Sequence, residues 1–201
     1  MSLVSAQTVK ELREKTNAGL MDCKKALEVS NGNIEEAIKV LREKGLASIS
    51  KKADRSTNEG RIFISNSINT AVIVEVNCET DFVARRPEFN ELAKNIAMQI
   101  ASNESIEVIS LNDISESMKS EVWKFESNKE DLINKPEEIK NKIVSGRVEK
   151  TLKTKVLLEQ PYIRDSNITV EEHIKQVISM LGENIKVRRF IRYVLGELDN
   201  I

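Results

Sequence analysis

Around residues 49–60 the spacing of apolar residues along this chain changes from the period of a helix to the period of a strand. Before this segment, ISKKADRSTNEG, apolar residues recur every three to four positions. After it they alternate, as in TAVIVEVNC (70–78), where Val72, Val74, Val76 and Cys78 share one face. The segment itself is polar and has no period, which is typical of a linker. The sequence therefore predicts a helical part at 1–48, a linker at 49–60 and a sheet-containing domain at 61–201.

The helical part is expected to form a compact unit of three short helices. Ser5 is a candidate N-cap for the first helix, and Asn33 caps the third, with Glu36 in capping-box position. Gly45 lies where a C′ glycine ends a helix, with at most one further helical turn after it. The third helix carries a helical apolar stripe: Ile34, Ala37, Ile38 and Leu41.

The larger domain is expected to mix strands and helices. Strands at 61–65 and 70–78 are joined by a hairpin at 66–69, and an amphipathic helix carries the apolar residues from Phe89 to Ile100. A short strand is a candidate at 106–109, a polar helical segment at about 112–158, and a helix that starts at Thr169 and stops at Gly182 precedes a final strand at 185–195. This order predicts an α+β fold with an antiparallel sheet and packed helices.

The residue composition limits the kinds of catalytic and metal site that the chain can form. The chain has one His and two Cys, so His-based mechanisms and a structural zinc set are poorly supported. There is no Gly-rich phosphate-binding motif, and the 32 acidic residues single out no catalytic pair. We expect no enzyme, no metal and no cofactor. The net charge of −1 argues against direct nucleic-acid binding, and no apolar run is long enough for a membrane. Cys23 and Cys78 are read as reduced thiols.

The most unusual segment is NCETDFVAR (77–85), which leaves a core strand and precedes a helix. Loops at such sheet ends often carry function. Phe82 stands out because only 4% of the chain is aromatic. In one interpretation Phe82 folds back onto Phe89 or Ala93 while Thr80 or Asp81 caps the helix. In the other, Asp81 and Phe82 form a protruding wedge that enters a partner's pocket, and an aromatic anchor of this kind dominates many interfaces.

Two groups of basic residues are ambiguous. Lys24 and Lys25 cannot both face the core, so at least one is solvated. They are either a solvated helix face or a contact with a partner. Arg188, Arg189 and Arg192 in the last strand either line an interface or protect a sheet edge.

Four stretches of the chain resemble the elongation factor Ts family. They are VKELREKTNAGLMDCKKALEVSNGNIEEAIKVLREKG (9–45), VEVNCETDFVARRPEF (74–89), IVSGRVEKTLKTKVLLEQPYIRD (143–165) and GENIKVRRFIRYVLGE (182–197). They occur in the family's order over almost the whole chain, and the match is weakest at about 104–135. The departures are Ser145, where an acid is expected, and Asn17, where glycine is usual.

The resemblance implies a guanine-nucleotide exchange factor for elongation factor Tu, a translational GTPase. The N-terminal helices would be a ubiquitin-associated-like module that docks on the GTPase domain, with Lys24 the better contact candidate and Lys25 the weaker. Thr80, Asp81, Phe82 and Val83 would form the loop that disturbs the Mg²⁺ and phosphate site and so promotes GDP release. The compact length indicates the short form with a single core. Short members can act as dimers, so the resemblance is compatible with a homodimer. The expected location is the cytoplasm.

Two other functions are compatible with the sequence. A helical adaptor would bind a peptide or ubiquitin-like partner through its first 45 residues alone. An RNA- or ribosome-binding accessory protein would need a basic surface with interleaved aromatic residues, which the sequence does not display. An exchange factor, in contrast, must bind the empty GTPase better than the loaded one, and nucleotide must weaken its binding by the same factor.

Overall fold

A computed structural model gives the structure of residues 4–16, 18–50, 52–132 and 135–197, so that Asn17 lies outside the described residues. The chain divides into two compact units that interrupt each other in sequence. The first comprises Met1–Ile62, Glu75–Ala93 and Glu172–Lys186, and the second Phe63–Val74, Lys94–Glu171 and Val187–Ile201. No helix within the described residues is long and apolar enough to cross a membrane. The three domain boundaries expected from the sequence stay a prediction.

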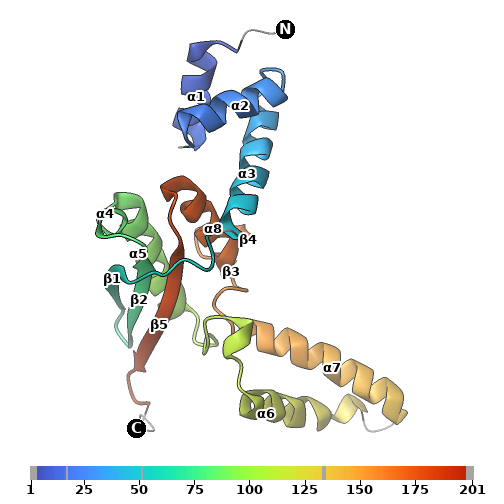
Figure 1. Cartoon of the computed structure of the whole chain (residues 1–201). Helices are drawn as coiled ribbons and strands as arrows, with labels where there is room; N and C mark the ends of the chain where they lie inside the picture. The colour runs from blue at the N-terminus through green and yellow to red at the C-terminus, as the bar shows by residue number, and fades with distance from the viewer. Residues whose placement is uncertain (1–3, 17, 51, 133–134, 198–201) are drawn as a thin grey trace. The chain divides into compact units, whose positions relative to one another are not determined.

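Three helices form the N-terminal module, as expected: α1 (Ala6–Thr16), α2 (Leu20–Val29) and α3 (Ile34–Ser50), drawn in blue in Figure 1. Ser5 Oγ accepts the Thr8 N–H at 3.1 Å, and Asn33 Oδ1 accepts the N–H groups of Glu35 and Glu36 at 3.0 and 3.2 Å. These bonds satisfy donors that a helix start leaves free. The module has its own buried apolar cluster of Val9, Leu12, Cys23, Ala26, Leu27 and Ala37.

Gly45 does not end the third helix. Helix α3 continues through it to Ser50, two residues into the stretch expected to be linker. A Cβ at Gly45 would lie 2.5 Å from Ser179 Oγ, which is too close, and 3.2 Å from Ser179 Cβ, which is a tight contact. Ser179 belongs to α8 (Val170–Leu181). The glycine therefore permits the close approach of two helices, and its role as a C′ residue was predicted wrongly.

The main sheet has three strands in the order β1-β2-β5: β1 (Glu59–Asn66), β2 (Thr70–Cys78) and β5 (Ile185–Val194). The β1–β2 hairpin is closed by a hydrogen bond from the Ser67 N–H to the Thr70 carbonyl at 2.8 Å. Along β2 the residues expected on one face are all fully buried: Val72, Val74, Val76 and Cys78. The predicted hairpin and the predicted α+β class are confirmed.

Helix α5 (Pro87–Ser102) is bonded to both outer strands. Arg61 of β1 donates to Asn90 Oδ1 at 2.8 Å. Arg192 of β5 donates to the carbonyls of Asn103 and Glu104 at 3.1 and 2.7 Å, just beyond the end of the helix. A cation there also interacts favourably with the helix dipole. Arg192 thus has a structural role, whereas Arg188 and Arg189 are exposed.

The short strand expected at 106–109 is absent, and a second sheet that was not expected lies nearby. That stretch makes a single bridge, between Val108 and Val156, and no strand. A second, two-stranded sheet was missed: β3 (Pro161–Tyr162) pairs antiparallel with β4 (Asp165–Thr169). Strand β3 has two residues, and the five residues of β4, DSNIT, include a single apolar side chain, so neither displays an apolar alternation.

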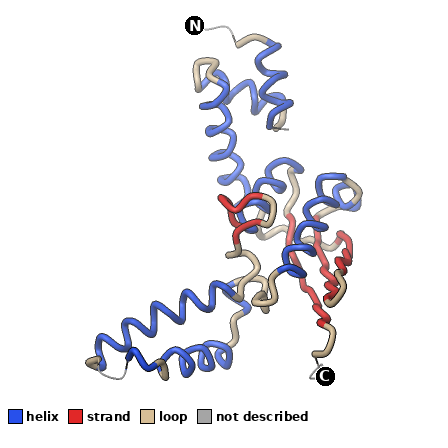
Figure 2. The backbone as a smooth tube through the Cα atoms, turned by 180° about the vertical axis from the view of Figure 1, so that it is seen from behind, coloured by secondary structure: helices blue, strands red, loops and turns tan. Residues whose placement is uncertain are grey.

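The polar helical segment expected at about 112–158 is a helical hairpin of α6 (Glu116–Ser127) and α7 (Glu137–Thr154). The two helices run side by side in Figures 1 and 2. Arg147 donates to both carboxylate oxygens of Asp131 at 3.0 and 2.6 Å. Short 3₁₀ turns at Leu111–Asp113 and Glu130–Leu132 flank α6. The hairpin has its own buried cluster: Val122, Leu132, Val144, Val148 and Leu152.

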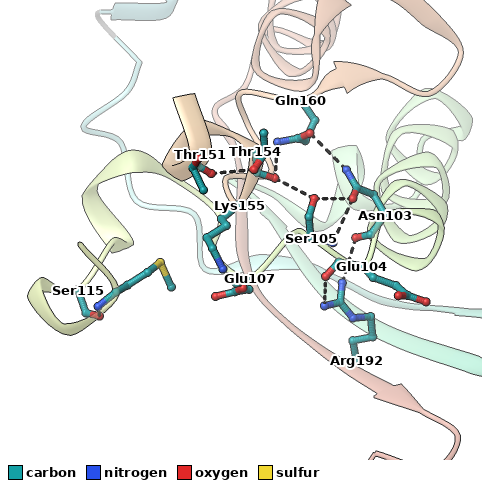
Figure 3. A network of polar contacts seen from close by, with 11 residues as sticks. Asn103, Glu104, Ser105, Glu107, Ser115, Thr151, Thr154, Lys155, Gln160 and Arg192 are labelled. Carbon is teal, nitrogen blue, oxygen red and sulfur yellow. Dashed lines mark hydrogen bonds and ion pairs between the residues drawn. The ribbon is translucent and has the colours of Figure 1, made fainter. Parts of the chain in front are cut away.

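The base of the hairpin is held by a polar network centred on Gln160, shown in Figure 3. The Gln160 side-chain amide donates to the carbonyls of Lys153, Thr154 and Val156 at 2.9, 3.0 and 2.7 Å. Its carbonyl oxygen accepts from Asn103 Nδ2 at 3.3 Å. The buried amide therefore bonds to carbonyls at the end of α7 and just after it.

Candidate functional site

The segment singled out in the sequence forms a short helix, α4 (Asp81–Ala84), directly after strand β2. Thr80 is its N-cap, in extended conformation, and Thr80 Oγ1 accepts the Val83 N–H at 3.4 Å. The Ala84 N–H donates to the Thr80 carbonyl at 3.2 Å. Thr80 therefore fixes the point at which the chain turns from the strand into the helix.

Phe82 projects from α4 into solvent, with 79% of its surface exposed. Its neighbours Val83 and Ala84 are buried, at 8% and 5%. Successive residues of a helix point about 100° apart, so a buried Val83 leaves the adjacent Phe82 on the outer side. The interpretation in which Phe82 folds back onto Phe89 is therefore wrong for this structure. A ring exposed in this way is free to enter a partner's pocket, and its burial there is favourable.

Asp81 is the only acidic residue of α4, and it is paired. Arg85 donates to Asp81 Oδ2 at 2.9 Å, in an i,i+4 relationship. Both side chains are about half or more exposed, so the pair contributes little stability. The wedge of Asp81 and Phe82 therefore presents an apolar ring beside a carboxylate whose charge is partly compensated. The sequence analysis did not identify Arg85 as a partner of Asp81, although the i,i+4 spacing was a usable signal.

The base of α4 is bonded to the turn between α8 and β5. The Thr80 hydroxyl donates to Glu183 Oε1 at 2.6 Å, and the Thr80 N–H donates to Glu183 Oε2 at 3.0 Å. The Cys78 thiol donates to the Thr80 carbonyl at 3.1 Å. Burial, and next the negative charge of Glu183, raise the pKa of Cys78 to about 11. The thiol is therefore protonated at neutral pH and is not poised as a nucleophile.

The second group of candidate residues, Lys24 and Lys25, lies on α2, and both side chains are exposed. Lys24 Nζ lies 4.0 Å from Glu28 Oε1. The same helix exposes three apolar side chains: Leu20 at 52%, Met21 at 61% and Val29 at 71%. Exposed methionine is common on surfaces that bind other proteins. Met21 starts the run 21–27 that was expected from the sequence to be exposed, whereas Leu20 and Val29 were not singled out.

A third exposed apolar surface lies on the main sheet. Ile73 is 38% exposed and points away from the buried Val72 and Val74. Ile191 and Tyr193, at 51% and 49%, lie on the face of β5 opposite Arg192. We call these three residues the open sheet face. It was not identified from the sequence.

The two cysteines and the histidine are candidates for covalent chemistry or metal binding. In the parts of the chain that the structure describes, no three or more His, Cys, Asp or Glu side chains are grouped to hold a metal ion. Cys23 and Cys78 are both buried free thiols. Burial lowers the pKa of His173, which keeps the imidazole neutral at physiological pH. The exposed features above are instead suited to contacts with another macromolecule.

Comparison with known proteins extends these observations to the whole chain. The family model described as "Elongation factor TS" matches residues 2–197. The chain is 62% identical over 198 residues to "Elongation factor Ts, chloroplastic" of Phaeodactylum tricornutum, with 98% of each chain covered. It is 54% identical to the protein of the same name from Galdieria sulphuraria, over 98% of this chain and 100% of the relative. It is 55% identical to "Elongation factor Ts" of Rippkaea orientalis, over 98% of this chain and 80% of the relative.

Proposed function

This chain belongs to the elongation factor Ts family of guanine-nucleotide exchange factors for elongation factor Tu, and we propose that its α4 wedge promotes GDP release. Phe82, with Asp81 beside it, enters the GTPase near its Mg²⁺ and phosphate site and displaces the groups that hold GDP. Thr80 and Val83 complete the loop by fixing α4. The family's exchange activity involves no covalent chemistry, so the wedge needs neither a nucleophile nor a cofactor.

The observation that carries this proposal is the exposure of Phe82 next to buried Val83. A thousandfold preference for the empty GTPase over the loaded one corresponds to about 4 kcal/mol. Burial of one phenylalanine ring contributes on the order of 1.5–3 kcal/mol. The ring therefore supplies a large part of the required difference if its pocket opens only when the nucleotide leaves. The remainder comes from other contacts of the wedge loop and the core.

The N-terminal module supplies the docking contact in this proposal. Lys24 and Lys25, together with the exposed Met21 and Val29, form one surface of α2 that can bind a GTPase domain. The module has its own buried cluster, so this surface is presented by a compact unit. Docking by α2 provides affinity that is the same for loaded and empty GTPase, while the wedge provides the difference between them.

The test measures release of a fluorescent GDP analogue from elongation factor Tu after excess unlabelled GDP is added. Catalytic amounts of the wild-type chain are expected to accelerate release many-fold. Phe82→Ala is expected to lose most of that acceleration while it keeps its fold and most of its affinity. Phe125→Ala is a matched control because Phe125 is also an exposed phenylalanine, at 67%, but lies on α6.

Three results would separate the alternatives. If Phe82→Ala and Phe125→Ala both act like wild type, the wedge assignment is wrong. If a folded wild-type chain accelerates nothing but the isolated module of residues 1–48 binds the GTPase fully, the chain is an adaptor. If binding to RNA appears and weakens steeply with added salt, the accessory function is supported instead.

We also propose that the chain forms a homodimer through the open sheet face. The support is the exposure of Ile73, Ile191 and Tyr193 on one sheet, since grouped exposed apolar residues can mark an interface between proteins. Sedimentation equilibrium is expected to give twice the mass of 22.8 kDa for wild type and the monomer mass for Ile191→Glu. A monomeric wild-type chain at micromolar concentration would exclude this dimer.

The site of action in this proposal is a compartment with bacterial-type translation. The relatives named above include chloroplastic proteins as well as a protein of Rippkaea orientalis. The plain cytoplasmic location expected from the sequence is therefore too narrow, and the chloroplast stroma is an equal candidate.

A further inference from the structure

We propose that Glu183 is a positioning residue of the wedge: its carboxylate holds Thr80 and thereby fixes the direction in which Phe82 projects. The inference rests on the proposed function of α4. It concerns a residue 101 positions after Phe82 in the chain.

The wedge helix cannot hold its own orientation. Helix α4 contains four residues, Asp81–Ala84, which is about one turn. An isolated helix of this length is unstable in water because nucleation is unfavourable. Its direction therefore depends on tertiary contacts at its two ends and on the buried side chains of Val83 and Ala84.

Glu183 makes the most specific of these contacts. It accepts two hydrogen bonds from Thr80, one from the hydroxyl at 2.6 Å and one from the backbone N–H at 3.0 Å. Two bonds from one carboxylate to one residue fix both its position and its rotation, and bonds to a charged acceptor are the stronger kind. Because Thr80 Oγ1 also accepts the Val83 N–H, the hydroxyl transmits this constraint to α4.

The residue that carries the carboxylate lies in a fixed turn. The backbone N–H of the next residue, Asn184, donates to Glu79 Oε1 at 2.7 Å. The bonding between the two segments is thus reciprocal. Glu183 accepts the backbone N–H of Thr80, and Glu79, the residue before Thr80, accepts the backbone N–H of Asn184. Asn184 is 3% exposed, and its side-chain amide donates to the carbonyls of Ala53 and Arg55 at 3.2 and 3.0 Å.

The same turn therefore also holds the segment that leads away from the N-terminal module. Arg55 adds an ion pair to Glu79 at 3.4 Å. The segment around residues 53–55 and the base of the wedge are therefore both bonded to the turn that contains Glu183 and Asn184. This arrangement suits a protein in which docking by the module must bring Phe82 to one place on the GTPase, because a displacement of about 1 Å at a working group can cost on the order of 10²-fold in rate.

The experiment uses the full chain in the fluorescent GDP release assay, with the concentration of exchange factor varied. Glu183→Ala is expected to lower the maximal exchange rate about tenfold, the equivalent of one lost charged hydrogen bond, and to change the half-saturating concentration less than threefold. Thr80→Val, which removes only the hydroxyl, is expected to act in the same direction. Glu183→Gln keeps one acceptor oxygen and is expected to fall between Glu183→Ala and wild type.

The decisive measurement repeats Glu183→Ala in a chain that already carries Phe82→Ala. If Glu183 acts through the ring, the second change has no further effect on the maximal rate. A further tenfold loss in that background would overturn the proposal, and so would a wild-type maximal rate for Glu183→Ala alone. A raised half-saturating concentration together with a lower unfolding midpoint would also overturn it, because it would indicate a general loss of structure.

Asp113→Ala is the matched control. Asp113 Oδ2 likewise accepts the N–H and the hydroxyl of one residue, Ser110, at 2.8 and 2.7 Å, but in the 3₁₀ turn before α6. It is expected to exchange nucleotide like wild type. The order of tests keeps the two proposals apart: an inactive wild type, or an active Phe82→Ala, refutes the proposed function. A normal Glu183→Ala beside an inactive Phe82→Ala refutes only the positioning role.

Discussion

Asp81 and Arg85 form an ion pair on the exposed wedge helix, with 2.9 Å between Oδ2 of the carboxylate and Nη2 of the guanidinium. Any role of Asp81 at the phosphate site of the GTPase must therefore compete with a neighbouring cation. An exposed pair of this kind is worth about 0–1 kcal/mol, so it can open in a complex, but it lowers the field that Asp81 exerts. The apolar ring of Phe82 has no such competitor in α4.

We accordingly expect Asp81→Asn to retain more exchange activity than Phe82→Ala. The substitution leaves the ring in place and removes a charge that Arg85 already compensates in part. Release of fluorescent GDP from elongation factor Tu gives both rates under the same conditions. A slower Asp81→Asn than Phe82→Ala would mean that the carboxylate, and not the ring, is the main displacing group.

For the docking surface, we expect Lys24→Ala to raise the half-saturating concentration of the exchange factor several-fold and to leave the maximal rate unchanged. Lys25→Ala should have a smaller effect. Lys10→Ala is the control, because Lys10 lies 3.8 Å from Glu14 on α1 in the same i,i+4 arrangement as Lys24 and Glu28. Equal effects of Lys10→Ala and Lys24→Ala would show that only net charge matters.

Two helical glycines should respond in opposite ways to alanine. Gly146 in α7 has nothing within 4 Å of an added Cβ, so Gly146→Ala should stabilise the chain by about 0.5–1 kcal/mol through helix propensity. At Gly45 the same gain is offset by the contact with Ser179. Thermal unfolding should rank Gly146→Ala above Gly45→Ala. The reverse order would mean that α3 does not approach α8 as described.

The buried thiol of Cys78 gives a prediction in alkaline solution. Its pKa is about 11 in the folded chain and close to 9.0 when unperturbed. The unfolded chain therefore loses this proton first, and the stability that the neutral thiol contributes is present below about pH 9 and declines as the pH rises toward 11. Thermal midpoints of wild type and Cys78→Ala should converge over this range. A constant difference between them would exclude the shifted pKa.

Gln160 should matter for the base of the helical hairpin. Gln160→Met keeps a similar volume but leaves the carbonyls of Lys153, Thr154 and Val156 without the amide donor. We expect a loss of about 1–3 kcal/mol in the free energy of unfolding. Urea denaturation followed by the fluorescence of Trp123, the one tryptophan of the chain, measures it. Gln7→Met on the exposed side of α1 is the control and should change little.

Local signals in the sequence were sufficient for most elements. Ser5 and Asn33 cap helices because their side-chain oxygens reach N–H groups two or three residues ahead, an interaction confined to one turn. The alternation of Val72, Val74 and Val76 fixed the buried face of β2 for the same reason. Helix capping and strand alternation both depend on residues a few positions apart, so they can be predicted without knowing the rest of the fold.

Tertiary structure decided what local pattern could not. Gly45 has the properties of a C′ residue, yet α3 continues through it, and the missing side chain instead lets Ser179 of α8 lie close. Phe82 could equally fold inward or project outward by its spacing. It projects because Val83 takes the buried side and Glu183, 103 residues from Thr80, holds the helix start. Contacts across such separations depend on how the chain closes on itself, and no periodicity within one segment encodes them.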